Sequence, residues 1–312
     1  MFFVVKFVII PEYLSFNHIY NYSMKKLREV INEARENKIA IGHFNISDTE
    51  ALTAVFNASQ KLNVPVIIGV TEGERNFIGI RRVAALVKSL REEYDYPIYL
   101  NADHTTSFEG IKEVIDAGFD AVLFDGTRRP LEENISITKR CVEYAHSVNP
   151  DILVEAEMGH IGASSMLLDK IPEGADFDPT MFTKPEDAKR FVEETGIDLL
   201  APSVGNLHGM IKNAANPNLD ISLIKKLCEV CGVPLVLHGG SGITDENFKE
   251  AIQAGINVVH INTEIRVAYR DTLKQTLQED SNVVAPYKFM KPAVDAMQEV
   301  VEKRLKLFSG LE

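Results

Sequence analysis

The sequence predicts an α/β fold, a (β/α)8 TIM barrel in which eight parallel strands alternate with helices. Two observations predict it: eight short apolar runs rich in β-branched residues, and amphipathic helical patterns in the segments between them. Continuous apolar strands that alternate with helices indicate a parallel sheet covered on both faces, and eight such units close into a barrel. An open doubly wound sheet is the alternative, but the sequence has no Gly-x-Gly-x-x-Gly motif after the first predicted strand.

The strands and helices follow one another along the chain with no low-complexity linker between them. The helical stretches include DTEALTAVFNASQKL at 48–62 and KPEDAKRFVEETG at 184–196. One long irregular stretch, 160–182, follows the fifth strand, and a loop of that length in a compact domain is usually functional. The eight strands are expected at residues 38–45, 64–70, 96–103, 119–126, 151–159, 197–205, 233–240 and 256–262.

The first residues of the chain do not fit the barrel pattern. Residues 1–10, MFFVVKFVII, are apolar but shorter than the roughly 20 residues that a membrane-spanning helix needs. Their charge pattern does not fit a signal peptide, and no clear small-residue cleavage site follows. We therefore expect residues 1–23 to be an N-terminal extension or an overlong start, and residues 24–312 to form a single barrel with C-terminal helices.

The overall charge is strongly negative, with 33 basic residues against 45 acidic ones and a net charge of −12. This balance argues against nucleic acid or an anionic membrane as a partner. A small anionic substrate would need local positive potential. The three cysteines do not make a disulfide framework and suit a cytoplasmic location, and the Cys-x-x-Cys pattern at 228–231 has no second pair, so we interpret it as packing.

Polar residues gather where the predicted strands end. In a barrel these carboxyl ends form the active face, and burying an imidazole or carboxylate there without a partner costs several kcal/mol. Three imidazoles and a carboxylate on one rim are typical ligands of a divalent metal, with zinc the best match and cobalt, manganese or iron left open. His43 and His146, by contrast, are interpreted as structural. The rim residues are Asp103, His104, Glu157, His208, His238 and His260.

A glycine-rich segment predicts a phosphate site. HGGSG at 238–242 follows the seventh strand and precedes a helical stretch. Glycines allow a ligand to approach the backbone, and the amides of the next turn can bind phosphate; loops after the seventh and eighth strands of a barrel are the usual place. Gly-Gly-Ser-Gly is also an ordinary turn, but NLHGMIK at 206–212 brings Gly209 and the cation of Lys212 to the adjacent loop.

Several motifs together resemble a known family. NADHTTSFEG, FDGTRRPLEENISITKRCVEYAH, VEAEMG, PEDAKRFVEETGIDLLAPSVGNLHG and LHGGSGI occur in the order and spacing of the class II metal-dependent fructose-bisphosphate and tagatose-bisphosphate aldolases, from about Lys38 to Arg266. The resemblance implies the reversible cleavage of fructose 1,6-bisphosphate into dihydroxyacetone phosphate and glyceraldehyde 3-phosphate, a step of glycolysis and gluconeogenesis. Tagatose bisphosphate is the alternative substrate. It also implies a homodimer or homotetramer, to which the helical segment 291–308 would contribute.

The resemblance also assigns roles by position. His104, His208 and His238 look like ligands of one zinc ion, and Glu157 like the carboxylate that contacts the metal in its alternative, buried position. Asp103 looks like the acid/base that acts on the C4 hydroxyl. A monovalent cation near the glycine loops is usual in that family. The substrate-binding positions of the family are matched by Asn45 and, at the dihydroxyacetone-phosphate end, by Gly209, Lys212, Gly239, Ser241, Asn262 and Thr263.

Three departures from the family pattern bear on the mechanism. His260 stands where the family typically has Asn, and we interpret it as catalytic, either as a hydrogen-bond partner of the reacting oxygens, as a proton carrier or as a further metal contact. GASS at 162–165 lacks the usual loop carboxylate, so a replacement for it near Ser165 is open, and Ser47 and Asp48 stand where the family tends to have two Asn residues.

These departures keep two other functions open. One is a barrel that binds zinc and a sugar phosphate with little turnover, and the other is a different metal-dependent lyase or isomerase. Asp103 favours an active aldolase, because a binding protein has no use for an acid/base. Schiff-base chemistry is disfavoured, since none of the predicted strands ends in lysine.

Overall fold

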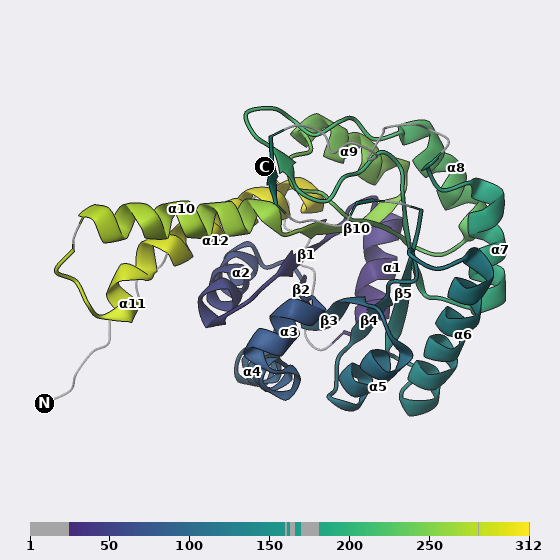
Figure 1. The fold of residues 1–312 in the computed structure, drawn as a ribbon, viewed down its shortest axis with the longest axis horizontal. Helices are drawn as coiled ribbons and strands as arrows, with labels where there is room; N and C mark the ends of the chain where they lie inside the picture. The colour runs from purple at the N-terminus through teal and green to yellow at the C-terminus, as the bar shows by residue number, and fades with distance from the viewer. Residues whose placement is uncertain (1–24, 160, 163–165, 170–180, 280, 312) are drawn as a thin grey trace, which may run out of the picture.

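A computed structural model describes residues 25–159, 161–162, 166–169, 181–279 and 281–311. Eight parallel strands close into a barrel in the order β1-β10-β9-β7-β5-β4-β3-β2, and helices surround it (Figure 1). The predicted barrel is therefore confirmed. The strands are β1 Ile41–Asn45, β2 Val66–Val70, β3 Ile98–Thr105, β4 Ala121–Phe124, β5 Leu153–Met158, β7 Leu199–Pro202, β9 Leu235–Leu237 and β10 Ile256–Ile261.

Several helices begin where a short polar side chain accepts a hydrogen bond from one of the first backbone amides. Asp48, Ser107 and Asp220 each accept a hydrogen bond from the amide three residues on, and each starts a helix directly after a strand or loop. The helices are α1 Leu27–Asn37, α2 Thr49–Leu62, α3 Glu72–Ile78, α4 Ile80–Tyr94, α5 Phe108–Asp116, α6 Leu131–Val148, α7 Pro185–Thr195, α8 Ile221–Cys231, α9 Asp245–Ala254, α10 Thr263–Glu279, α11 Pro286–Phe289 and α12 Lys291–Ser309.

The core has two parts, and the smaller one closes one end of the barrel. The larger lies between the strands and the surrounding helices. The smaller joins the apolar face of α1, including Val30 and Ile31, to inward residues near the starts of strands, such as Ile67 and Leu153. Helix α1 therefore covers the amino-terminal end of the barrel, and the opposite, carboxyl end is the expected place for a site.

Inward-facing residues change from apolar to polar along the strands. Because side chains alternate between faces with a period of two, β5 points Leu153, Glu155 and Glu157 inward, and all three are buried. The same change takes β10 from Val258 to His260. The polar residues therefore meet at the carboxyl ends of the strands.

Helices α10 and α12 pack side by side and project beyond the barrel, with α11 at the far end (Figure 1). The C-terminal part of the chain is thus helical. A two-stranded sheet joins β6 Leu167–Leu168 to β8 Met210–Ile211, and so ties the loop after β5 to the loop after β7. Within the described ranges, none of the helices has the length and apolar character needed to cross a membrane.

Candidate metal and substrate site

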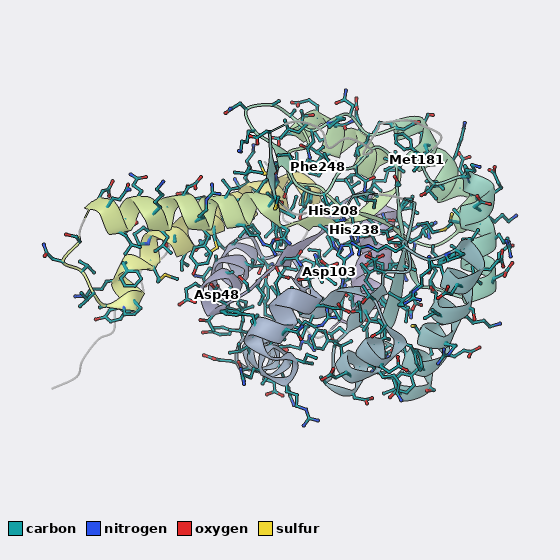
Figure 2. All side chains as sticks on the ribbon, viewed as in Figure 1. Asp48, Asp103, Met181, His208, His238 and Phe248 are labelled. Atoms are coloured by element: carbon teal, nitrogen blue, oxygen red, sulfur yellow. The ribbon has the colours of Figure 1, made fainter. Side chains whose placement is uncertain are left out.

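The predicted rim residues converge at the open end of the barrel. Asp103, His208 and His238 lie near its centre (Figure 2). His104, Glu157, His208 and His238 each offer a ligand atom, and these atoms lie within 4.8 Å of one another. The structure thus brings together the four residues that the sequence analysis assigned to a metal.

A β-bulge lets two neighbouring residues, Asp103 and His104, serve the same site. Adjacent strand residues normally face opposite sides of the sheet. Here the register between β3 and β4 shifts between Ala102 and Thr105, and His104 has a left-handed φ of 43°. A non-glycine residue in this conformation costs about 1–2 kcal/mol. The bulge also explains why β3 extends to Thr105, two residues beyond its predicted end.

The buried guanidinium of Arg75 holds this bulge. Nη1 donates to the backbone oxygens of Val70 at 2.8 Å and Asp103 at 2.9 Å, and Nη2 donates to Oγ1 of Thr105 at 2.9 Å. Arg75 therefore fixes the backbone on both sides of His104. These charge-assisted hydrogen bonds offset the cost of the left-handed backbone.

The donor atoms of the four-residue cluster fit a metal ion. Oε2 of Glu157, Nε2 of His208 and Nδ1 of His238 are buried and have no hydrogen-bond partner among the described residues. Nδ1 of His238 lies 3.5 Å from Oε2 of Glu157. Buried polar atoms without partners are costly, and three imidazoles with one carboxylate are ligands that zinc accepts.

Two carboxylates behind the cluster orient its rings. Nε2 of His238 lies 2.7 Å from Oε1 of the buried Glu155, and Nδ1 of His104 lies 3.0 Å from Oδ2 of Asp125. Asp125 is itself held by the amide and hydroxyl of Thr127. Because the nitrogen beside Glu155 carries the proton, the other nitrogen of His238 is left with a lone pair for a metal.

The electrostatics of the cluster in its metal-free form couple protons to metal binding. Burial opposes the charged form of His104, but Asp103, Asp125 and Glu157 together raise its pKa to about 10. Burial raises the pKa of Glu157 to about 7, although His238 and His104 oppose this. A divalent cation would displace these protons, since ligands bind metals in their deprotonated forms.

Asp103 is placed to act as a base. Its Oδ2 accepts a hydrogen bond from Nδ2 of Asn45 at 2.9 Å, whereas its buried Oδ1 has no hydrogen-bond partner among the described residues. Oδ1 lies 3.6 Å from Nδ1 of His260 and 3.9 Å from Nε2 of His104. Burial opposes ionisation, but His104, His260 and His43 hold the pKa of Asp103 well below its usual range, so the carboxylate is ionised.

His260 stacks on a second buried histidine, His43. The ring centroids are 3.4 Å apart and the planes differ by 4°. Nε2 of His43 lies 3.2 Å from Nδ2 of Asn101, and a Cβ added at Gly69 would lie 2.1 Å from Cε1 of His43. His43 and His260 also form a possible ligand group with Asp103. Because lone pairs lie in the ring planes, two parallel stacked rings do not both aim at one ion, so the four-residue cluster is the better candidate for a metal site.

The predicted phosphate positions lie in three loops that hydrogen bonds join. Nδ2 of Asn216 donates to the backbone oxygens of Gly209 at 2.8 Å and Ser241 at 2.9 Å. Oγ of Ser241 accepts from the amides of Asn262 at 3.3 Å and Glu264 at 3.2 Å. Thr263 is the first residue of α10, and a helix N-terminus attracts anions.

Close packing explains one glycine of these loops. Gly239 has a φ of 63°, and a Cβ there would lie 2.5 Å from the backbone oxygen of Leu207. Lys212 was predicted to supply a cation here, and its Nζ lies 2.7 Å from Oδ1 of Asp169 at the surface. A role of Lys212 in phosphate binding stays a prediction. Ser165 and residues 1–23 lie outside the described residues.

Sequence reasoning missed the supporting residues Glu155, Asp125 and Arg75. Glu155 had a signal, because it precedes Glu157 by two in VEAEMG and so faces the same side of the strand. Asp125 directly follows β4, at a position where functional residues are expected. Nothing local marked Arg75, whose partners come from the ends of two strands.

Comparison with known proteins shows which family this chain resembles over nearly its whole length. The sequence profile of the family described as Fructose-bisphosphate aldolase class-II matches residues 25–311. A fructose-bisphosphate aldolase from Geobacillus stearothermophilus is 37% identical over 291 residues, which cover 92% of this chain and 98% of that protein. One from Staphylococcus aureus is 36% identical over 285 residues, which cover 90% of this chain and 96% of that protein.

Two solved structures share the fold. The YdjI aldolase from Escherichia coli K12 superposes with a TM-score of 0.76 at 30% identity, over 90% of this chain and 95% of that one. A fructose-bisphosphate aldolase from Campylobacter jejuni gives a TM-score of 0.77 at 21% identity, over 91% of this chain and 94% of that one. At that identity the second likeness concerns the fold alone.

Proposed function

We propose that this chain, which belongs to the class II fructose-bisphosphate aldolase family, reversibly cleaves fructose 1,6-bisphosphate into dihydroxyacetone phosphate and glyceraldehyde 3-phosphate. The observation that carries the proposal is the meeting of His104, His208, His238 and Glu157 beside the ionised Asp103. The reaction needs both an electron sink and a proton carrier within a few ångströms. The names of the relatives support the choice of fructose 1,6-bisphosphate.

Class II aldolases generally depend on zinc, and the donor set here fits it. His104, His208 and His238 would hold the ion, with Glu157 as a further carboxylate ligand. When bound, zinc supplies a Lewis acid that polarises the ketose carbonyl and so accepts electron density from the breaking bond. Glu155 and Asp125 keep two of the rings in their binding orientation.

Asp103 would move the proton of the C4 hydroxyl. In cleavage its free Oδ1 takes that proton while the C3–C4 bond breaks and C4 becomes the aldehyde carbon. In condensation the same oxygen returns the proton to the new hydroxyl. Asn45, which donates to Oδ2, keeps the carboxylate turned so that Oδ1 faces the site.

His260 would hold the reacting oxygens. Both of its ring nitrogens are buried and have no hydrogen-bond partner among the described residues. Burial, together with His43 and His238, lowers its pKa well below the usual range. A neutral ring can donate one hydrogen bond to a substrate oxygen near C3, as an amide would do from the same position.

The glycine loops would bind the phosphate of dihydroxyacetone phosphate. Backbone amides around Gly209, Gly239 and Ser241, and that of Thr263 at the start of α10 beside Asn262, would supply donors that suit an anion. Lys212 and a monovalent cation near these loops would add positive charge. Both additions rest on the family resemblance.

We also propose that the protein is a homo-oligomer in the cytoplasm. The arm formed by α10 and α12 presents apolar side chains to solvent: Leu277 is 45% exposed and Tyr287, in α11, is 76% exposed. A second subunit packed on this arm would cover these side chains. Light scattering should then give the mass of a dimer or tetramer, and the mass of a monomer would contradict this part.

The main test is metal-dependent cleavage. Purified protein loaded with zinc should release triose phosphate from fructose 1,6-bisphosphate, lose this activity with a chelator and regain it with zinc. Tagatose 1,6-bisphosphate run in parallel shows which C4 epimer is preferred. Protein that binds zinc stoichiometrically but releases no triose phosphate from either sugar would show a binding barrel instead of an aldolase.

A further inference from the structure

The ring of His260 lies between two other buried histidine rings. His43 on β1 and His260 on β10 are register partners in neighbouring strands, and their rings stack with centroids 3.4 Å apart and planes 4° from parallel. The ring of His238 also lies on His260, with centroids 4.0 Å apart and planes that differ by 30°. Since two rings cannot share one face of a third ring at these distances, His43 and His238 cover opposite faces of His260.

We propose that His43 is a positioning residue for the aldol reaction: its ring fixes the plane of the His260 ring and so directs the nitrogens of His260 to the reacting oxygens of the substrate. This inference rests on the proposed function, which takes His260 as the hydrogen-bond partner of those oxygens. It gives a role to a residue that the motifs and the family resemblance left unassigned.

The surroundings of His43 hold its ring in place. Nδ2 of Asn101 lies 3.2 Å from Nε2 of His43, and donates to it when the ring carries its proton on Nδ1. A Cβ at Gly69 would lie 2.5 Å from the same Nε2, so the ring fits because position 69 has no side chain. Burial lowers the pKa of His43 to about 4, although Asp103 opposes this, and the neutral ring stacks on His260 without charge repulsion.

The plane of the His260 ring decides where its nitrogens point. Nδ1 lies 3.6 Å from Oδ1 of Asp103, and Nε2 lies 4.0 Å from Oε2 of Glu155. These distances are too long for hydrogen bonds, and Nδ1, Nε2 and Oδ1 of Asp103 are buried with no hydrogen-bond partner among the described residues. A substrate oxygen beside Nδ1 can therefore accept from the ring, next to the carboxylate that acts at C4. A tilted ring would turn Nδ1 away from that oxygen.

Two substitutions separate the ring face of His43 from its hydrogen bond. In the zinc-loaded enzyme, His43→Gln keeps a polar group for Asn101 but removes the ring. It should lower kcat for cleavage of fructose 1,6-bisphosphate about 10- to 100-fold, since a misplacement of about 1 Å can cost about 100-fold. KM should stay within about threefold, and zinc affinity within about twofold, because His43 is outside the four-residue cluster.

Asn101→Ala makes the opposite change, because it keeps the ring and removes its hydrogen bond. This variant should lower kcat several-fold, which is less than the loss in His43→Gln, and it stays informative if His43→Gln does not fold. His146→Gln is the matched control. His146 is in α6 and pairs with Asp198 at 3.0 Å, so this change should leave kcat as in the wild type.

A half-reaction shows where the effect acts. With dihydroxyacetone phosphate alone, the enzyme should exchange a hydrogen of the hydroxymethyl carbon, which becomes C3 of the ketose, with solvent deuterium. This exchange needs no proton transfer at C4. His43→Gln should slow it by about the same factor as cleavage, because His260 serves the oxygens near C3.

Three results would overturn the proposal. One is a lower unfolding temperature of His43→Gln with kcat per zinc-loaded molecule unchanged, which is what a purely structural role predicts. Another is exchange at the wild-type rate beside slow cleavage, and the third is a larger loss of kcat in Asn101→Ala than in His43→Gln. Wild-type protein that neither cleaves the ketose nor exchanges this hydrogen would instead contradict the proposed function.

Discussion

Glu155 is an informative residue to change, because its Oε1 contacts the ring of His238 in the four-residue cluster, while its Oε2 lies 4.0 Å from Nε2 of His260. The side chains of Glu155 and His238 are almost fully buried, at 1% and 0% exposure, and Oε1 lies 2.7 Å from Nε2 of the His238 ring. Glu155→Gln keeps the size of the side chain but removes the charge that orients the imidazole and raises its basicity. Loss of such a partner typically weakens metal affinity about 10- to 100-fold, or about 1.4–2.8 kcal/mol.

The pH dependence of this effect gives a sharper test. Burial opposes a charged His238, but Glu155 and Glu157 raise its pKa above the ordinary value. In the wild type, zinc must therefore displace a proton from this ring, whereas Glu155→Gln lowers both its affinity for zinc and its affinity for the proton. The variant should lose most affinity at high pH, and the loss should shrink as the pH falls.

The assay is zinc competition with a chromophoric chelator at several pH values, with thermal unfolding of the metal-free protein beside it. Glu246→Gln is the matched control, since it removes the same charge from an exposed position at the start of α9. Zinc affinity in Glu155→Gln equal to that of the control at all pH values would refute the role that we give to Glu155.

Three further predictions follow from the geometry. Asp103→Ala should keep stoichiometric zinc, as measured by metal analysis, but lower kcat by about 10²–10⁴-fold. A variant that binds zinc and keeps near-normal kcat would contradict the role of Asp103 as acid/base. Because the pKa of His104 is raised to about 10, zinc should displace its proton and bind more tightly as pH rises towards that value; calorimetry in buffers of different ionisation enthalpy should detect at least about one proton released per ion, and none would contradict the ligand assignment. Gly69→Ala should place a Cβ 2.1 Å from the ring of His43 and lower stability by about 1–3 kcal/mol. Gly73→Ala, with nothing within 4 Å of the added Cβ, should leave the unfolding temperature nearly unchanged, and equal effects of the two changes would refute the packing argument.

The fold was predictable because local pattern and global architecture agree in this chain. Each of the eight predicted strands overlaps a strand of the barrel, and helices fill the intervals between them. The predicted metal ligands also meet, because the carboxyl ends of parallel strands must lie at one end of a barrel. Residues such as His104 and His238, far apart in the sequence, could therefore be assigned to one site from their place on the strands alone.

The sequence by itself thus determined the barrel, the end of it that bears the chemistry and the set of residues offered there. Tertiary structure alone decided how Asp103 and His104 share one face, since the bulge depends on hydrogen bonds from Arg75 to two strands. It also decided that His43, interpreted from sequence as structural, lies against His260, and that Arg266 reaches Glu74 across 192 residues of sequence. The physical reason is that strand and helix periodicity is a local property, whereas backbone strain, ring stacking and ion pairing depend on which strands become neighbours when the barrel closes.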